Sequence, residues 1–182
     1  MTYQAPIPRP EGAADFDFLI GEWRVRNLRL KERLAGMDVM DDRNWDEFET
    51  RYRMWPLVGG LANVDSMTGI LNSGYFEGVS FRQFEAGKDG DPGQWRIWWL
   101  DTSNPRLTEQ VRGSFLDTPE GRTAEFFGEE MFGGRTTNLR FRWIDPGDGT
   151  ARWDQAYQYP DGNERVGTWE VNWVMEFTRP VR

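Results

Sequence analysis

The sequence predicts an all-β protein, an antiparallel up-and-down β-barrel of about ten strands. Apolar and aromatic residues recur with a period of two rather than 3.6 along most of the chain. Each run is bounded by Gly, Pro, Asn or Asp, which favour reversal of the chain. Most of these connections are short, so consecutive strands should pair antiparallel. Closure into a barrel leaves no edge strand unpaired, whereas a β-sandwich is the alternative because a strand count does not report closure.

The ten expected strands follow one another from the first tryptophan to the C-terminal region. We predict strands over residues 22–30, 46–55, 61–71, 75–85, 94–101, 107–115, 122–132, 136–144, 151–159 and 166–178. The turns between them include "NSG" at 72–74, "TPEG" at 118–121 and "DPGDG" at 145–149. These turns supply residues that accept a positive φ or that preset φ for a reversal.

Two segments depart from this pattern. In "DFDFLI" (residues 15–20), Phe16, Leu19 and Ile20 have helical spacing and Asp15 is placed to cap, which predicts one helical turn packed under the barrel. Residues 1–14 should form an extended N-terminal arm, and residues 15–182 a single domain.

The longest connection spans residues 31–45 and carries Leu34, Met37, Val39 and Met40. A long loop with several apolar side chains either covers an opening of the barrel or is an ordinary ordered surface loop. The sequence leaves both interpretations open.

Composition excludes several classes of function. The chain has no Cys and no His, which removes disulfides, thiolate and imidazole metal sites and catalytic triads that need a His. The net charge of −8 disfavours nucleic-acid binding. The first residues have no basic stretch followed by an apolar run, and no apolar segment approaches the ~18 residues of a membrane span. We therefore expect a cytoplasmic protein without a metal site and without a nucleic-acid or membrane partner.

The string "DFDFLIGEW" (residues 15–23), a short aromatic turn running into Gly-x-Trp, resembles the start of lipocalin and calycin barrels. It is most similar to an uncharacterised bacterial calycin-like family. "GGLANVD" (59–65), "EGVSFRQF" (77–84), "WRIWWLD" (95–101) and "GTWEVNWVMEFTR" (167–179) also resemble that family. The resemblance extends from about residue 15 to residue 179 and concerns the fold more than the function.

The resemblance implies that Gly21 and Trp23 lie at the closed end of the barrel. It also implies that Arg179 packs over the Trp23 ring, a cation–π contact that we interpret as structural closure. Related barrels called nitrobindins bind haem through a His, which this chain lacks, so that activity does not carry over. We expect no cofactor.

Strand parity assigns the inward faces. On the last strand we expect one face inward and the other outward: Trp169, Val171, Trp173, Met175 and Phe177 inward, and Glu170, Asn172 and Glu176 outward. On "QWRIWWLD" the inward set should be Trp95, Ile97, Trp99 and Asp101, and the outward set Arg96, Trp98 and Leu100. Asp101 then lies near a rim of the barrel.

Two further strands place polar groups among inward rings. Trp153, Gln155, Tyr157 and Tyr159 share one face, as in a ligand-binding lumen or in a filled core with a hydrogen-bonded amide. Asn63 and Asp65 share a face with Leu61 and Met67, and if that face is inward they need partners.

These rows predict that a small, largely apolar ligand binds in the lumen. The candidate ligand-binding residues are Trp99, Asp101, Trp153, Gln155, Tyr157, Trp173, Asn63 and Asp65. One alternative is a cofactor-free isomerase or lyase in the same lumen, with Asp or Glu as the base and Tyr or Arg stabilising an oxyanion. A second is an interaction module that forms a homodimer through exposed aromatics such as Trp98 and Trp55. We favour binding, and a barrel filled by side chains, with no pocket above ~300 Å³, would overturn it.

Overall fold

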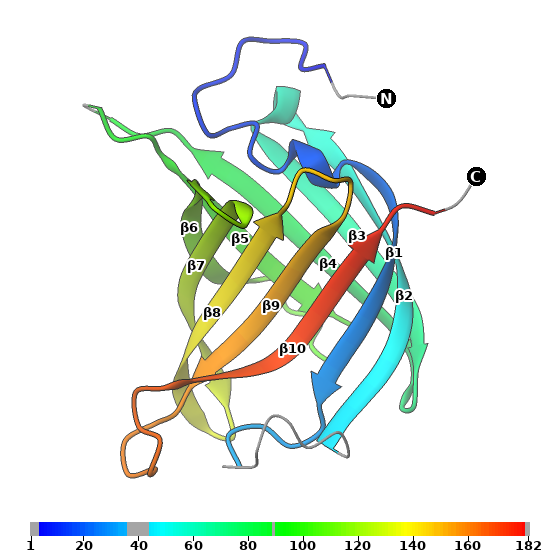
Figure 1. The fold of residues 1–182 in the computed structure, drawn as a ribbon, viewed down its shortest axis with the longest axis vertical. Helices are drawn as coiled ribbons and strands as arrows, with labels where there is room; N and C mark the ends of the chain where they lie inside the picture. Colours follow the sequence, from blue (N-terminus) through cyan, green and yellow to red (C-terminus); the bar gives the residue numbers. More distant parts are fainter. Residues whose placement is uncertain (1–3, 36–43, 89, 181–182) are drawn as a thin grey trace.

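Ten antiparallel strands form a closed barrel in the computed structural model, which describes residues 4–35, 44–88 and 90–180 (Figure 1). Consecutive strands are neighbours throughout, and β10 returns to pair with β1. The strands are β1 (Gly21–Leu30), β2 (Trp45–Leu57), β3 (Ala62–Leu71), β4 (Gly74–Glu85), β5 (Gln94–Asp101), β6 (Thr108–Thr118), β7 (Gly121–Phe132), β8 (Arg135–Asp145), β9 (Ala151–Gln158) and β10 (Trp169–Thr178). The prediction of an all-β, up-and-down barrel is confirmed, and the sandwich alternative is wrong.

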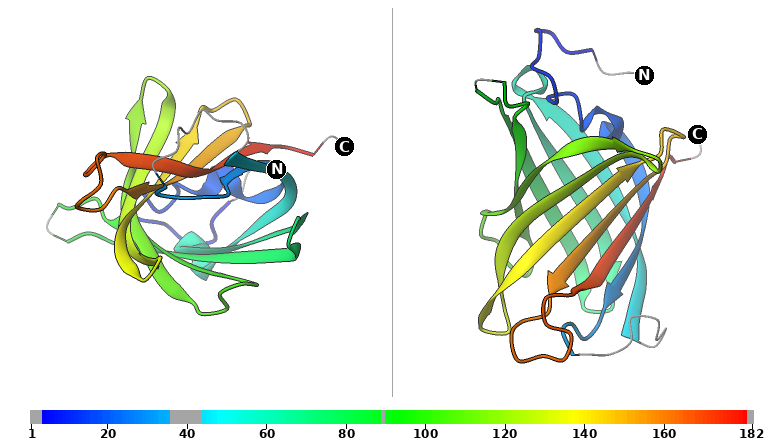
Figure 2. Two further views of the ribbon diagram at one scale, coloured as in Figure 1. Left: turned by 90° about the horizontal axis from the view of Figure 1, so that it is seen from below. Right: turned by 60° about the vertical axis from the view of Figure 1, so that its left-hand side comes forward.

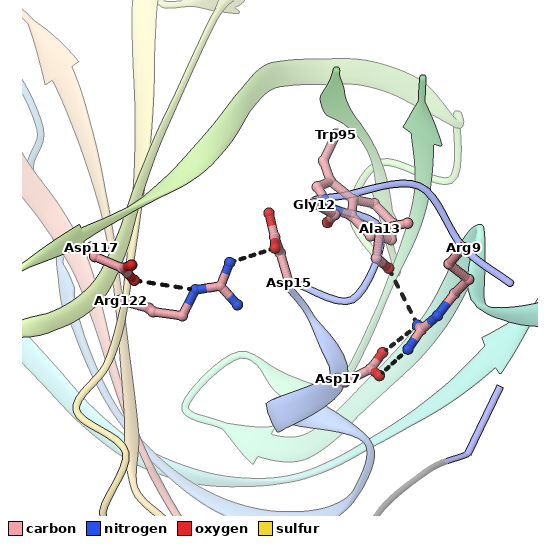
Figure 3. A network of polar contacts seen from close by, with 8 residues as sticks. All are labelled: Arg9, Gly12, Ala13, Asp15, Asp17, Trp95, Asp117 and Arg122. Atoms are coloured by element: carbon pink, nitrogen blue, oxygen red, sulfur yellow. Dashed lines mark hydrogen bonds and ion pairs between the residues drawn. The ribbon is translucent and has the colours of Figure 1, made fainter. Parts of the chain in front are cut away.

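One short 3₁₀ turn, η1 (Asp17–Leu19), precedes β1, and a second, η3 (Val58–Gly60), joins β2 to β3. The helical turn that we expected near the N-terminus is therefore present, but Asp15 does not cap it. Phe16 is the N-cap residue, and it makes no capping hydrogen bond through its side chain. The Asp15 carboxylate instead accepts a hydrogen bond of 2.5 Å from Nη2 of Arg122, on β7 (Figure 3).

The N-terminal segment closes one end of the barrel, the upper end in Figure 1. The Phe16 ring packs edge-on against Trp95 at 5.1 Å between centroids and against Trp143 at 5.9 Å. Within the stretch where we expected an extended arm, Gly12 accepts a hydrogen bond of 3.0 Å from the Trp95 indole, and Ala13 is fully buried (Figure 3). This segment therefore packs as part of the barrel core.

The last strand contains a β-bulge, which changes its predicted parity. Its pairing with β9 passes from Val171–Ala156 to Trp173–Gln155, so Asn172 is an extra residue. Beyond the bulge, Trp173, Met175 and Phe177 are buried as predicted.

Before the bulge the prediction is wrong, because one inserted residue exchanges the two faces of a strand. Glu170 and Asn172 are buried, at 3% and 0% exposure. Trp169 and Val171 are only half-buried, and Trp169 contacts one residue of β7 and one of β8. Its ring lies 6.1 Å from that of Phe127 and 5.4 Å from the Arg140 guanidinium.

On β5 the parity prediction holds. Trp95 and Ile97 are buried in the core, and Trp99 and Asp101 continue the same row. Trp98, on the other face, packs on Phe81 at 5.7 Å and beneath the Arg96 guanidinium at 5.1 Å. The three tryptophans of this stretch therefore lie on two faces of the strand and do not surround one common ligand site.

The connection between β1 and β2 is described only at its ends. Met37, Val39 and Met40, which we expected on a loop covering the barrel, lie outside the described residues. Leu34 is half-buried, and its backbone N–H donates to Oε1 of Glu170 at 2.7 Å. In the described ranges, no helix has both the length and the apolar composition needed to cross a membrane.

Candidate functional site

A cavity of about 80 Å³ lies inside the barrel, below the N-terminal segment. A buried water needs roughly 10–15 Å³ on this measure, so the space holds on the order of six water-sized groups. Its walls combine four tryptophans with several charged and polar side chains. The lining residues are Arg29, Arg33, Tyr52, Asp65, Met67, Ser80, Arg82, Ile97, Trp99, Asp101, Gln110, Glu130, Phe141, Trp143, Trp153, Gln155, Tyr157, Trp173 and Met175.

The cavity is much smaller than the ~300 Å³ at which ordinary ligand pockets begin. Most of the lumen is filled by side chains, so the inward aromatic rows serve mainly as core. A second hollow, of about 610 Å³, lies where β1 ends and β2 begins, at the lower end of the barrel in Figure 1. Arg29 and Arg33 line both spaces. They therefore mark the mouth, where the inner cavity meets the outer hollow; Figure 2 (left) views the barrel from this end.

The structure brings together all but one of the ligand-binding residues predicted from the sequence. Those that line the cavity are Asp65, Trp99, Asp101, Trp153, Gln155, Tyr157 and Trp173. Asn63 does not line it; its side-chain oxygen accepts a hydrogen bond of 3.1 Å from Arg82 deeper in the core. Tyr159, on the same predicted face as Tyr157, is also buried outside the cavity and donates to Glu170 at 2.5 Å.

The cavity floor is a buried polar network on β2, β3 and β4. Arg82 and Asp65 form an ion pair, with their side chains 3% and 1% exposed. The Tyr52 hydroxyl donates to Oδ2 of Asp65 at 2.9 Å, and the Ser80 N–H donates to Oδ1 at 3.2 Å. Both carboxylate oxygens of Asp65 are thus occupied by protein donors.

The pKa values of two of these groups are shifted from their ordinary values. Burial raises the pKa of Tyr52 well above its ordinary value, and the Asp65 charge adds to this, so Tyr52 stays a hydrogen-bond donor. Burial opposes the charge of Arg82, but Asp65 and Tyr52 together outweigh it, and the pKa of Arg82 is raised. Among the described residues, Nε of Arg82 has no hydrogen-bond partner.

Hydrogen bonds fix the orientation of the indole rings in the wall. The Trp173 indole donates to Oδ1 of Asn27 at 3.0 Å, and the Trp99 indole donates to Oδ2 of Asp101 at 3.1 Å. The two rings are nearly perpendicular, with centroids 6.4 Å apart. Gln155, also in the wall, donates to Oδ1 of Asn172 at 2.9 Å.

Trp99 needs a glycine beside it on the next strand. A Cβ built on Gly78 would lie 2.1 Å from a ring carbon of Trp99, far inside van der Waals contact. Gly78 therefore allows the indole to pack close against β4, which is a packing reason for a glycine inside a strand.

Charged side chains gather at the mouth of the cavity. The Arg29 guanidinium lies 4.6 Å from the centre of the Trp173 ring, and that of Arg33 lies 5.8 Å from the Tyr157 ring. The Tyr157 hydroxyl donates to Oε2 of Glu130 at 2.7 Å and accepts a longer bond of 3.4 Å from Arg33.

Ionisation at the mouth follows from burial and from neighbouring charges. Burial and, second to it, the charge of Arg33 lower the pKa of Arg29 to about 10. Burial and then the Glu130 carboxylate raise the pKa of Tyr157. Arg29 is thus a partly desolvated cation that faces a second cation.

The predicted closure residues lie at the other end of the barrel and do not line the cavity. The Arg179 guanidinium is 3.4 Å from the centre of the Trp23 ring. It donates to the backbone oxygens of Phe18 at 2.8 Å and Ile20 at 3.1 Å. A Cβ on Gly21 would lie 3.3 Å from the same guanidinium, so this glycine leaves room for the stack.

Sequence reasoning missed Arg29, Tyr52 and Arg82. Each one continues an inward row: Arg29 follows Trp23, Val25 and Asn27 on β1, Tyr52 lies between Thr50 and Met54 on β2, and Arg82 lies between Ser80 and Phe84 on β4. An arginine in phase with buried residues is the signal that could have identified two of them.

No protein-family model matches the chain, and no curated protein matches it. In the part of the chain that the structure describes, no three Asp or Glu side chains gather as the ligands of a metal ion would. The site is therefore interpreted from its own geometry.

Proposed function

We propose that this protein binds a small organic molecule in the barrel lumen, with entry at the mouth marked by Arg29 and Arg33. The observation that carries the proposal is the cavity itself, which lies inside a closed barrel and is lined by four tryptophans together with polar groups. Apolar walls with a few fixed polar groups are typical of ligand sites. The N-terminal segment packs across the other end, so the mouth is the route that this geometry favours.

The cavity volume limits the ligand. A group of roughly six non-hydrogen atoms fills the inner space, by the same measure as for water. A larger ligand would extend into the outer hollow of about 610 Å³. The inner cavity alone is smaller than the ~300 Å³ that the sequence-based prediction required, so the ligand that we propose fills the inner space and reaches the outer hollow at the mouth. The resemblance to calycin-like barrels agrees with a lumenal site.

The hydrogen bonding of Asp65 supports binding rather than catalysis. A general base needs a free oxygen within reach of the substrate proton. Both oxygens of Asp65 already accept hydrogen bonds, from Ser80 and from Tyr52, and Arg82 pairs with the same carboxylate. The Tyr52–Asp65–Arg82 group therefore fits a rigid polar floor better than a proton-transfer site.

Native mass spectrometry of freshly purified protein, followed by titration with six-carbon compounds, tests the proposal. The compounds are hexanoate, hexanamide, 1-hexanol and hexylamine, and tryptophan fluorescence is the readout. We expect at least one of them to bind saturably. The variant Ile97→Phe fills the cavity and should weaken binding by about tenfold or more, since it displaces the ligand.

The matched control is Leu100→Phe, which enlarges a half-buried side chain on the outward face of the same strand. It should bind as the wild type does. If no compound binds and no copurified mass is found, or if the two variants behave alike, the lumen is not a binding site.

A further inference from the structure

We infer that the ligand carries a carboxylate, which Arg29 and Arg33 hold at the mouth of the cavity. The inference rests on the proposed function and adds the chemical class of the ligand. Arg29 occupies the last inward position of β1, in phase with the buried Val25 and Asn27, so its side chain enters the lumen. Both arginines line the inner cavity and the outer hollow. Both arginines therefore lie between the two spaces.

Neither arginine has its charge neutralised by direct contact. Within the described residues, no carboxylate forms an ion pair with Arg29 or Arg33, whereas Arg9, Arg26, Arg82, Arg122 and Arg142 each have one. Arg29 contacts the Trp173 ring, and Arg33 contacts Tyr157 through its ring and a long hydrogen bond. Their N–H donors are thus available to a bound anion.

The acidic groups nearby are already engaged. Oδ1 of Asp101 accepts hydrogen bonds from the backbone N–H groups of Ser103 and Asn104, and Oδ2 accepts one from the Trp99 indole. Glu130 accepts the hydrogen bond of Tyr157. Asp101 and Glu130 influence Arg29 through their charge but do not occupy its donors.

This arrangement favours a carboxylate over other charged groups. Guanidinium groups are planar and match the two oxygens of a carboxylate in a paired hydrogen bond. A singly charged anion between the arginines also relieves their mutual repulsion. A doubly charged phosphate would be repelled more strongly by Asp101, by Glu130 and by the net charge of −8. An ammonium ligand would meet two cations at the mouth.

The geometry also orients the ligand. The Arg29 guanidinium lies over the Trp173 ring, which packs edge-on against Trp153 at 5.6 Å. A carboxylate at the arginines therefore leaves the apolar end of the ligand against the tryptophans. Short-chain or small aromatic carboxylic acids have a carboxylate for the arginines, an apolar end for the tryptophans, and a size that fits the site.

Titration of the wild type with hexanoate and with its neutral isostere hexanamide tests the inference, with hexylamine as the cationic member. We expect hexanoate to bind about tenfold or more tightly than hexanamide, as is typical of hydrogen bonds to a charged group. The preference should fall to about threefold or less in Arg29→Gln and Arg33→Gln, with Arg29→Lys intermediate. Arg24→Gln, on the exposed face of the same strand, should keep the full preference.

The outcomes separate this inference from the proposed function. Equal binding of hexanoate and hexanamide, or an unchanged preference in both Gln variants, overturns the carboxylate assignment and leaves lumenal binding intact. Failure of every compound to bind overturns both. Far-UV circular dichroism of each variant checks that its fold is retained.

Discussion

Arg82 on β4 and Asp65 on β3 form an ion pair that is almost completely buried at the floor of the lumen. The pair does not stand alone, because Tyr52 and Ser80 donate to Asp65 and Asn63 accepts from Arg82. Two charges removed from water are tolerated only when such further hydrogen bonds satisfy them. The inward polar residues of β3 are therefore explained by a partner on the neighbouring strand.

Replacing Asp65 with Asn should destabilise the protein strongly, because Arg82 would remain buried without a counter-charge. We expect a loss of about 3–5 kcal/mol in the free energy of unfolding, measured by urea denaturation. Glu47→Gln is the matched control, since it breaks an exposed ion pair with Arg26 that solvent screens, and it should change the free energy of unfolding far less. Equal effects of the two substitutions would contradict the importance of burial.

Gly78→Ala should displace the Trp99 indole, because the new methyl group would overlap the ring. Overpacking of this kind costs about 1–3 kcal/mol. The near-ultraviolet circular dichroism of the tryptophans should change with it. In a Trp99→Leu background the same substitution should cost much less, and if it costs as much, the close approach is not its cause.

Arg179→Leu should destabilise the closed end of the barrel. It removes the stack on Trp23 and the hydrogen bonds to the carbonyl groups of Phe18 and Ile20, at about 1–3 kcal/mol in total. Thermal unfolding measures the effect. Arg179→Lys keeps the charge but not the set of donors, so it should restore only part of the stability. Unaltered ligand binding in both variants is also expected, since this end lies away from the cavity.

The contribution of Asp101 to the free energy of unfolding should depend on pH. Burial acts to raise the pKa of Asp101, but hydrogen bonds from Ser103, Asn104 and Trp99 outweigh it, and the pKa lies below its ordinary value of 3.8. A lowered pKa in the folded state means that the contribution is fully present above pH 3.8. It is lost as the pH falls through the folded-state pKa.

The difference in unfolding free energy between the wild type and Asp101→Asn should therefore be constant from pH 7 to about pH 5 and should shrink below pH 3.8. Urea denaturation at several pH values measures it. Ser103→Ala, which removes the hydroxyl that donates to this carboxylate, should reduce the pH dependence. A difference that stays the same down to pH 3 would show that the hydrogen bonds do not favour the charged form.

The barrel and most of its faces could be predicted from the sequence because strand parity and turn residues are local signals. The inward residues of β5 follow directly from strand alternation, because β5 pairs with β4 without a bulge from Gln94 to Asp101. The same rule failed at Trp169, where one extra residue shifts the register. A bulge depends on how two strands pair, and the sequence of one strand alone does not show where it occurs.

The polar part of the site could not be predicted in the same way. Arg82 and Asp65 are charged residues, which an apolar core does not normally contain. Their burial is favourable only because β3 and β4 place them side by side. The volume of the lumen depends on the side-chain conformations of four tryptophans. Hydrogen bonds to Asn27 and Asp101 fix two of these rings, and such contacts join residues from different strands.

The seam between β1 and β10 joins residues that lie 150 positions apart, as in the bond from Arg26 to Glu176. Every other neighbouring pair of strands is consecutive in the chain. Loop-closure entropy therefore opposes this one seam far more than any hairpin, and non-local pairing of this kind slows folding. A circular permutant that joins the two termini and opens the chain between β5 and β6 would make the β1–β10 pairing more local and the β5–β6 pairing non-local. Hydrogen exchange during refolding should then find that β1 and β10 pair earlier, and β5 and β6 later, than in the wild type.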